Sequence, residues 1–270
     1  MILVQLTDLH VRPRGQPAMR SCETNMLTER ALRAVRDFRP RPDAVVITGD
    51  LTHNGRVAEY RALAEMLARL IDLPLYVIPG NHDDRDNFRD VLRHLPGVTS
   101  DPEFVHYAVE DLPVRLVMLD TLIPGRTEGE LCPGRLDWLD AALSLQPDKP
   151  TIIAMHHPSF RCGIGHMDRI ILRDPAAFEA VVARHRQVQR IICDHHHRII
   201  TANVAQAIAS TGPGVAHIVE LDLFSDNPGL WTLEPPAFQV HAWIDGTGIV
   251  SHTAFVERYP GPYPFVPDPV

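Results

Sequence analysis

Five short apolar segments, each ending in a potential metal ligand, constrain this chain of 270 residues more than any other feature. Each segment has the length and composition of a buried β-strand, and a polar side chain follows where the strand would end. The segments are 4–10 with Asp8 and His10, 43–50 with Asp50, 75–83 with Asn81, His82 and Asp83, 151–158 with His156, and 190–197 with His195 and His197. Ligand sites on open α/β sheets form beyond the carboxyl ends of strands. We therefore expect these side chains to gather at the strand ends of one sheet.

The chemistry of these side chains favours a catalytic rather than a structural metal site. A single strand that ends in Asp or His is usually capped or hydrogen-bonded, but five in order favour a metal site. Carboxylate, amide and imidazole donors without thiolates suit Fe, Mn, Zn or Co. Cys193 precedes the last group, yet its neighbours Ile191 and Ile192 indicate a small buried side chain rather than a ligand. We predict a site for two metal ions, with Asp50 as the bridging ligand.

The order of predicted elements indicates an α/β fold. Apolar residues recur at helical spacing over 23–38, 57–70, 135–145 and 175–185. A further strand, 115–121, carries Asp120, which we interpret as structural rather than as a ligand. Strands on both sides of the chain's midpoint predict a two-sheet β-sandwich flanked by helices.

The chain changes character after Pro213, where loop-forming residues become frequent. We interpret 1–217 as a catalytic domain and 218–240 as a cap or interface segment. Trp231, Phe224 and Phe238 in that segment either line a substrate pocket or subunit interface, or simply pack the last sheet. Residues 241–270 are predicted to contain the final strands and a Pro-rich tail, whose run 258–264 is expected to wrap the surface.

Composition indicates an enzyme for small substrates. The chain is 45% hydrophobic and can bury a large core, while its net charge of −8 argues against a broad nucleic-acid surface. It begins directly with a predicted strand, and no apolar run reaches the roughly 18 residues that span a bilayer. We therefore expect a cytoplasmic protein. Four widely spaced cysteines predict free thiols, with a link between Cys132 and Cys162 left open.

The ordered motifs resemble those of the calcineurin-like metallophosphoesterases. They are Asp8-Leu9-His10, Gly49-Asp50, Gly80-Asn81-His82-Asp83, His156 and His195-His196-His197. Within that family the chain is similar to the class III cyclic nucleotide phosphodiesterases and to the bacterial glycerophosphodiesterases that group with them. The resemblance spans about residues 1–220, and it implies the same two-sheet layout and a homo-oligomer assembled through the cap.

The resemblance also implies a role for each motif residue. One metal ion is held by Asp8, His10, Asp50 and His197, and the other by Asp50, Asn81, His156 and His195. His82 contacts the phosphate and helps the leaving group, and Asp83 supports the ligands. The implied reaction is attack of a metal-bound hydroxide on a small phosphodiester, either a glycerophosphodiester or a 3′,5′-cyclic nucleotide. We count Asp50 and His82 as catalytic, and Asn81, His82, His196 and His217 as substrate-binding.

One position departs from the family pattern, because Asp194 stands where the family has Gly. A family Gly suggests either a strained backbone or a close approach of another group, and Asp is among the few other residues that tolerate a positive φ. The added carboxylate either tightens one metal ion or perturbs the geometry and lowers activity. His196 either faces the substrate or is a solvent-exposed turn residue. The alternative functions are a phosphomonoesterase and, because of Asp194, a catalytically weak metal-bound phosphate sensor.

Overall fold

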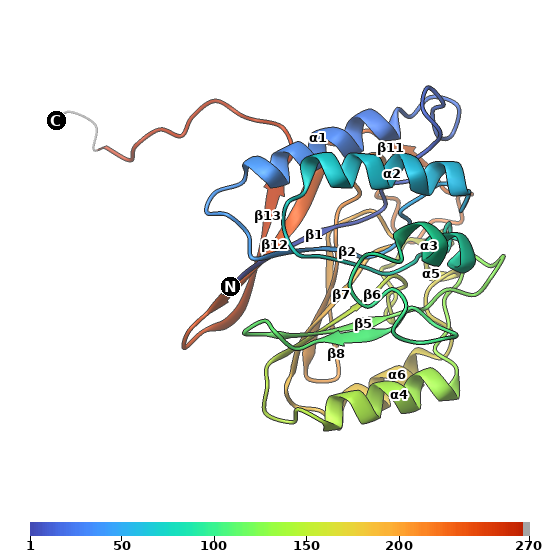
Figure 1. The fold of residues 1–270 in the computed structure, drawn as a ribbon, viewed down its shortest axis with the longest axis vertical. Coiled ribbons are helices and arrows are strands. Elements are labelled where there is room, and N and C mark those ends of the chain that lie inside the picture. The colour runs from blue at the N-terminus through green and yellow to red at the C-terminus, as the bar shows by residue number, and fades with distance from the viewer. Residues whose placement is uncertain (267–270) are drawn as a thin grey trace.

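Two β-sheets packed between two layers of helices make up residues 1–266, the part of the chain that the computed structural model describes (Figure 1). The first sheet has the strand order β13-β12-β1-β2-β3, and the second has the order β4-β5-β6-β7-β9-β8. The first sheet comprises β1 (Ile2–Leu6), β2 (Ala44–Ile47), β3 (Leu75–Val77), β12 (Ala237–Ile244) and β13 (Gly248–Phe255). The second comprises β4 (Tyr107–Val109), β5 (Arg115–Leu119), β6 (Thr151–Met155), β7 (Val188–Cys193), β8 (Ile200–Val204) and β9 (Ala207–Thr211). The predicted two-sheet sandwich is confirmed.

The central strands are parallel and buried on both faces. Strands β1, β2 and β3 run parallel in the first sheet, as do β5, β6, β7 and β9 in the second. Every residue of β2, β5 and β6 is buried, which explains why these segments are continuously apolar rather than alternating. Helices on the outside and a second sheet on the inside cover both faces.

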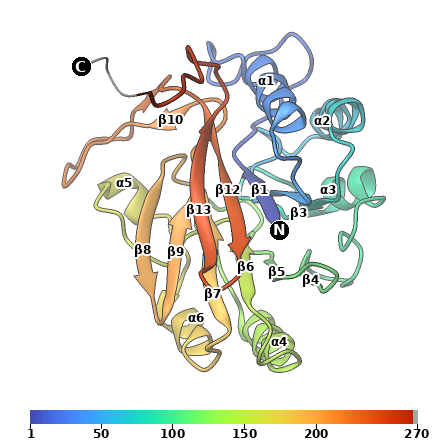
Figure 2. The ribbon, with the colours of Figure 1, turned by 90° about the vertical axis from the view of Figure 1, so that its left-hand side faces the viewer.

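Helices cover the outer face of each sheet (Figure 2). The first sheet is covered by α1 (Thr24–Asp37), α2 (Val57–Leu70) and α3 (Arg85–Leu92), and the second by α4 (Pro133–Ser144) and α6 (Pro175–Val182). A short helix, α5 (Gly165–Asp168), lies apart from these layers. Leu32 of α1 and Leu63 of α2 join the core that contains both sheets, while Leu139 of α4 and Phe178 of α6 belong to a second core cluster.

The four helices predicted from periodicity are present, and one of them ends earlier than predicted. Residues 175–185 were expected to be helical, but α6 stops at Val182 and the chain turns before His185, which pairs with Asp140 of α4 at 2.6 Å. Helix α3 was not predicted. It is only eight residues long and buries only Phe88 and Leu92, which is too few apolar residues to establish a helical period from the sequence. The side chain of Asp84 caps its start by accepting a hydrogen bond from the backbone N of Asn87.

The C-terminal part forms two different structures. Strands β10 (Ile218–Val219) and β11 (Trp231–Thr232) pair with each other outside both sheets. Strand β12 begins at Ala237 and pairs with β1, so the last four residues of the predicted segment 218–240 belong to the first sheet. Phe238 is buried in the core, whereas Phe224 is 90% exposed.

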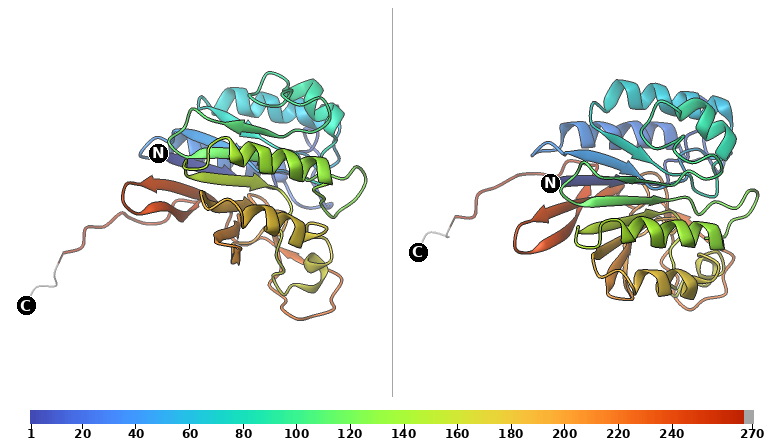
Figure 3. Two further views of the ribbon diagram at one scale, coloured as in Figure 1. Left: turned by 90° about the horizontal axis from the view of Figure 1, so that it is seen from below. Right: turned by 60° about the horizontal axis from the view of Figure 1, so that its bottom comes forward.

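The Pro-rich tail does not wrap the surface as expected. The chain leaves the body after β13 and extends away from it (Figure 3), and residues 258–266 are all exposed. Prolines lack an amide donor, so this run cannot join the edge of β13 by ladder hydrogen bonds. Residues 267–270 of the predicted tail lie outside the described residues.

Two further observations concern the predicted class of the protein. None of the helices in residues 1–266 combines the length and apolar character needed to cross a bilayer. All four cysteines are free, so Cys132 and Cys162 are not linked. Cys193 is fully buried, as its apolar neighbours predicted.

Candidate metal centre

The predicted ligands lie on loops that follow five parallel strands. Asp8 and His10 follow β1, Asp50 follows β2 and Asn81 follows β3. His156 follows β6, and His195 and His197 follow β7. Strands β6 and β7 belong to the second sheet, so the expectation that one sheet would supply all ligands is wrong. Because the two sheets pack together with these strand ends at a common edge, the loops of both sheets converge on one site.

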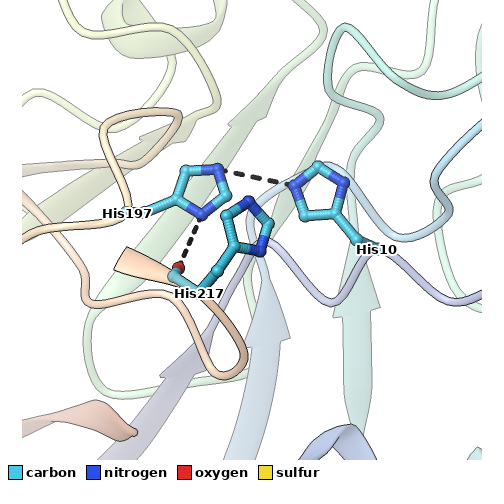
Figure 4. A group of neighbouring side chains, drawn as sticks. All are labelled: His10, His197 and His217. Atoms are coloured by element: carbon cyan, nitrogen blue, oxygen red, sulfur yellow. Dashed lines mark hydrogen bonds between the residues drawn. The ribbon is translucent and has the colours of Figure 1, made fainter. Parts of the chain in front are cut away.

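A first group of donors surrounds Asp8 and His197. The Nε2 atom of His197 lies 3.3 Å from Asp8 Oδ1 and 3.4 Å from His10 Nε2. His10 Nε2 is also 3.7 Å from Asp50 Oδ2. Figure 4 shows the rings of His10 and His197 side by side, with His217 next to them. One ligand atom from each of Asp8, His10, Asp50 and His197 lies within 4.8 Å of all the others, which is the grouping expected for one metal ion.

A second group of donors lies on the other side of Asp50. His156 Nε2 is 3.5 Å from Asp50 Oδ2 and 3.1 Å from Asn81 Oδ1. The ring centroids of His156 and His195 are 5.2 Å apart. The same carboxylate oxygen of Asp50 therefore faces His10 in the first group and His156 in the second. This is the place that a bridging ligand occupies between two cations.

Five of the seven predicted ligands have a left-handed backbone. Their φ angles are 50° at Asp8, 46° at His10, 48° at Asp50, 69° at His195 and 53° at His197. Such a conformation costs a non-glycine residue on the order of 1–3 kcal/mol and concentrates at functional sites. Asp194 is not among the residues with positive φ. The expectation of a strained backbone at Asp194 is therefore wrong, since the strain lies at the two histidines that follow.

The donor set fits positively charged ions. Asp8 Oδ1 and His195 Nε2 are buried and have no hydrogen-bond partner. Within residues 1–266, the ion pairs of Asp8 and Asp50 involve histidines only. Buried carboxylates need a compensating charge, and two cations between these groups would supply it. Carboxylate, amide and imidazole groups are donors that divalent transition metals accept.

Burial and neighbouring charges shift the pKa values of the donors in both directions, and only some of the shifts favour the metal-binding form. Burial acts to lower the pKa of His156, but the carboxylate of Asp50 raises it to about 10. Burial raises the pKa of Asp8. Burial also acts to raise the pKa of Asp50, but the imidazoles of His156 and His82 hold it well below its usual value. Burial lowers the pKa of His10 and His195 well below the usual value, so both rings are neutral, the form that binds a metal ion.

Two glycines are required by close approach to the donors. A Cβ atom on Gly49, whose φ is +108°, would lie 2.4 Å from His156 Nδ1. A Cβ atom on Gly80 would lie 2.3 Å from Asp50 Oδ1. The Gly-Asp and Gly-Asn motifs thus use glycine to bring the loops of β2 and β3 against the ligands.

His82 faces the site but is not one of the predicted ligands of either metal ion. Its backbone N donates to Asp50 Oδ1 at 2.8 Å, and its Nδ1 donates to the carbonyl of His53 at 2.8 Å. The Nε2 atom is then left for a substrate. Asp83 is buried behind the loop that follows β3, and its carboxylate accepts hydrogen bonds from Gly80 N at 2.9 Å and Tyr60 Oη at 2.8 Å.

The other predicted substrate contacts differ in position. The ring of His217 lies 4.3 Å from that of His197 and 4.9 Å from that of His10, and its Nδ1 has no hydrogen-bond partner (Figure 4). His196 is fully buried with both ring nitrogens unpartnered, so its interpretation as an exposed turn residue is wrong. Burial lowers the pKa of His196 to about 4, and Asp168 of α5 opposes this effect.

The structure also brings His53 to the site, a histidine that flanks the predicted motifs and that the sequence favoured as structural. A ring nitrogen of His53, together with those of His10 and His82, forms a group within 4.8 Å. Its position three residues after Asp50, on the loop that follows β2, was the available signal. By contrast, His157 is held by Thr121 Oγ1 at 2.8 Å and the carbonyl of Thr127 at 3.2 Å, which gives it a structural role.

Comparison with known proteins identifies the family. Residues 1–200 match the family described as Calcineurin-like phosphoesterase. The chain belongs to this family. The expected resemblance is confirmed, and with it the expectation of a metal-dependent hydrolase. The buried Asp120, which pairs with Arg85 at 2.7 Å, is structural as predicted.

Curated relatives align over almost the whole phosphoesterase chain. A probable glycerophosphodiester phosphodiesterase GpdQ of Arcobacter nitrofigilis is 34% identical over 266 residues, covering 98% of this chain and 97% of that protein. A probable cyclic nucleotide phosphodiesterase of Rhodopseudomonas palustris is 34% identical over 266 residues, covering 97% and 94%. A solved dimetal phosphatase from Danio rerio shares the fold, with a TM-score of 0.67, 18% identity, and coverage of 95% of this chain and 99% of that chain.

Proposed function

We propose that this protein is a dinuclear-metal phosphodiesterase that hydrolyses small phosphodiesters, either glycerophosphodiesters or 3′,5′-cyclic nucleotides. One observation carries the proposal: Asp50 Oδ2 lies 3.7 Å from His10 Nε2 and 3.5 Å from His156 Nε2, between two groups of donors. The names of the two aligned relatives supply the substrate classes.

The two donor groups would hold two cations from Fe, Mn, Zn and Co. Asp8, His10, Asp50 and His197 would hold one, and Asp50, Asn81, His156 and His195 the other. When bound, such a pair polarises the phosphate and makes water a nucleophile at neutral pH.

The remaining steps fall to side chains around the donors. His82 would donate from Nε2 to the phosphate and to the departing oxygen in its doubly protonated form, because its Nδ1–H already donates to the carbonyl of His53. The Asn81 amide and the His217 ring would orient the phosphate, since both lie against the donors. Donors fixed by the fold need no rearrangement as charge develops on the phosphate oxygens.

Small substrates fit the charge of the chain. A net charge of −8 repels nucleic-acid polymers but affects a singly charged diester much less. A cytoplasmic location remains a prediction, and fractionation of the native host by immunoblot would test it.

We expect the purified full-length protein, supplied with Mn²⁺ or Co²⁺, to hydrolyse bis(p-nitrophenyl) phosphate faster than p-nitrophenyl phosphate. The aligned relatives are named phosphodiesterases. Both substrates release p-nitrophenolate, so the comparison reports the preference for a diester or a monoester and not the need to protonate the leaving group. Release of p-nitrophenol gives kcat/KM for both substrates. A strong preference for the monoester would instead support the phosphomonoesterase. Parallel assays on glycerophosphocholine and cyclic AMP would then separate the two diester classes.

We also propose that a second copy of the chain covers the predicted interface segment. Its apolar side chains are unusually exposed: 58% for Leu221, 90% for Phe224, 56% for Leu230 and 63% for Leu233. An apolar patch of this kind marks an interaction surface.

Substituting Phe224→Glu and Leu233→Glu together should convert the assembly to a monomer, because charges in an apolar interface lose their hydration. Light scattering during size-exclusion chromatography measures the mass. Leu145→Glu, at a residue 75% exposed beyond α4, is the matched control and should leave the assembly intact. A wild-type protein that is monomeric at micromolar concentration would contradict this proposal.

A further inference from the structure

A buried polar network joins the two sheets directly behind the metal centre. The carboxylate of Asp194, at the end of β7, accepts hydrogen bonds from Gln5 Nε2 at 2.9 Å, from Gly212 N at 3.0 Å and from Thr48 Oγ1. Asp194, Gln5 and Thr48 are all buried. The carboxylate thus connects β7 and β9 in the second sheet with β1 and β2 in the first.

Gln5 extends this network across the first sheet. Its Nε2 also donates to the carbonyl of Cys193 at 3.1 Å, and its Oε1 accepts from His241 Nε2 at 2.9 Å. His241 is bonded in turn to Ser251 Oγ at 2.7 Å. Both polar ends of a glutamine in the core are therefore satisfied, which is the condition for burying it at low cost.

The absence of a side chain at Gly212 leaves room for the carboxylate of Asp194. A Cβ atom on Gly212 would lie 2.7 Å from Asp194 Oδ1. Gly212 therefore lets its backbone N reach a carboxylate that any larger residue would displace. The acidic side chain at position 194 is therefore buried in a space that the neighbouring residues leave for it.

The network reaches the ligands of one ion in particular. The carboxylate reaches His156 through Thr48, whose Oγ1 donates to Asp194 and whose carbonyl accepts from His156 Nδ1 at 2.9 Å. The backbone N of Asp194 also donates to the carbonyl of His156 at 2.8 Å, a contact that does not depend on the side chain. Asp194 also directly precedes His195. His156 and His195 are the two imidazoles assigned to the second ion.

The ligands of the first ion are oriented by other groups. His197 Nδ1 donates to the carbonyl of His217 at 3.0 Å. Asp8 Oδ2 accepts from Thr7 Oγ1 at 2.9 Å. Neither contact involves Asp194.

We infer that Asp194 is a positioning residue that holds His156 and His195 in place for the second metal ion, so that its carboxylate strengthens the binding of that ion. The inference rests on the proposed dinuclear site and deepens it. Hydrogen bonds that fix a metal-ligating histidine typically change metal affinity by about 10–100-fold. The acidic residue then supports the site and does not restrain it, in contrast to the sensor alternative.

The test is a calorimetric titration of the metal-free full chain with Co²⁺. Wild type should bind two ions per chain. Asp194→Gly should weaken the second ion by about 10–100-fold and leave the first unchanged within about twofold. Asp194→Asn should recover part of the loss, because its amide oxygen still accepts from Gly212 N. Asn81→Ala identifies the binding step of the second ion, since Asn81 belongs to that ion only.

Ser251→Ala is the matched control, because it removes a hydroxyl at the far end of the same network. It should leave both binding steps unchanged. Circular dichroism of each metal-free variant checks that it is folded. Gln5→Leu removes the partner from β1 and should weaken the second ion in the same direction as Asp194→Gly.

Two results would overturn the inference alone. One is an Asp194→Gly chain that binds both ions as wild type does. The other is an equal loss at both steps together with a lower unfolding temperature of the metal-free protein, which would show a general structural role. A wild-type chain that binds a single ion would instead overturn the proposed function and the inference with it.

Discussion

Replacing Asp50 by alanine is expected to abolish phosphodiester hydrolysis. Asp50 is the only predicted ligand shared by both donor groups, and its Oδ2 lies within 3.7 Å of His10 and 3.5 Å of His156. Removing it leaves each ion one ligand short and also frees the backbone N of His82, which donates to Asp50 Oδ1. The loss of kcat/KM should exceed the roughly 100-fold expected for an outer partner of a ligand.

The same variant should lose the stabilisation that metal gives to wild type. An ion present at about 1,000 times its dissociation constant stabilises the folded state by about 4 kcal/mol. We therefore expect Mn²⁺ to raise the unfolding temperature of wild type but not that of Asp50→Ala, as measured by scanning calorimetry. Asp148→Ala, at an exposed carboxylate after α4, is the control. An Asp50→Ala protein with wild-type turnover would contradict the assigned role.

Replacing His82 by alanine should lower kcat on bis(p-nitrophenyl) phosphate by about 100- to 1,000-fold. The Nδ1–H of the ring donates to the carbonyl of His53 and the ring faces the donors, so in its doubly protonated form it would supply a fixed hydrogen-bond donor to the phosphate. His82 is not among the predicted metal ligands. Metal content should therefore stay at two ions per chain, as measured by elemental analysis.

The control for His82 is His94→Ala, at an exposed histidine outside the site. A loss of metal that parallels the loss of activity would make His82 a ligand. An unchanged kcat would remove it from the reaction. A leaving group that needs no proton, such as p-nitrophenolate, should depend on His82 less than an alkoxide does.

The site residues were predictable because the sequence patterns that indicate them are local. Each ligand follows an apolar run that forms a buried strand, and residue order alone indicates where each strand ends. The strand β2 and the helix α2 were predicted closely for the same reason, since apolar spacing defines both.

Sheet membership was not predictable, because it depends on contacts between distant residues. Strand β1 pairs with β12, more than two hundred residues away, and β9 is inserted between β7 and β8. No local pattern indicates that β6 and β7 lie in a different sheet from β1. The burial of His196 was not predictable either, because the same position in a turn is compatible with an exposed or a buried side chain.

The role of Asp194 required the structure for a similar reason. Its partners Gln5 and Thr48 lie 189 and 146 residues away along the chain. From the sequence, the residue was only a departure from the family Gly, which suggested a strained backbone or a close approach. The structure instead gives it three hydrogen-bond donors and assigns the left-handed backbone to His195 and His197.

The central claim is that Asp50 lies between two adjoining metal ions. A crystal structure of the protein grown with Mn²⁺, with anomalous maps recorded on both sides of the manganese edge, tests it most directly. We predict two ions per chain, roughly 3.5–4 Å apart, with Asp50 bound to both, His10 and His197 on one, and His156 and His195 on the other. A single ion, or a second ion away from His156 and His195, would contradict the claim.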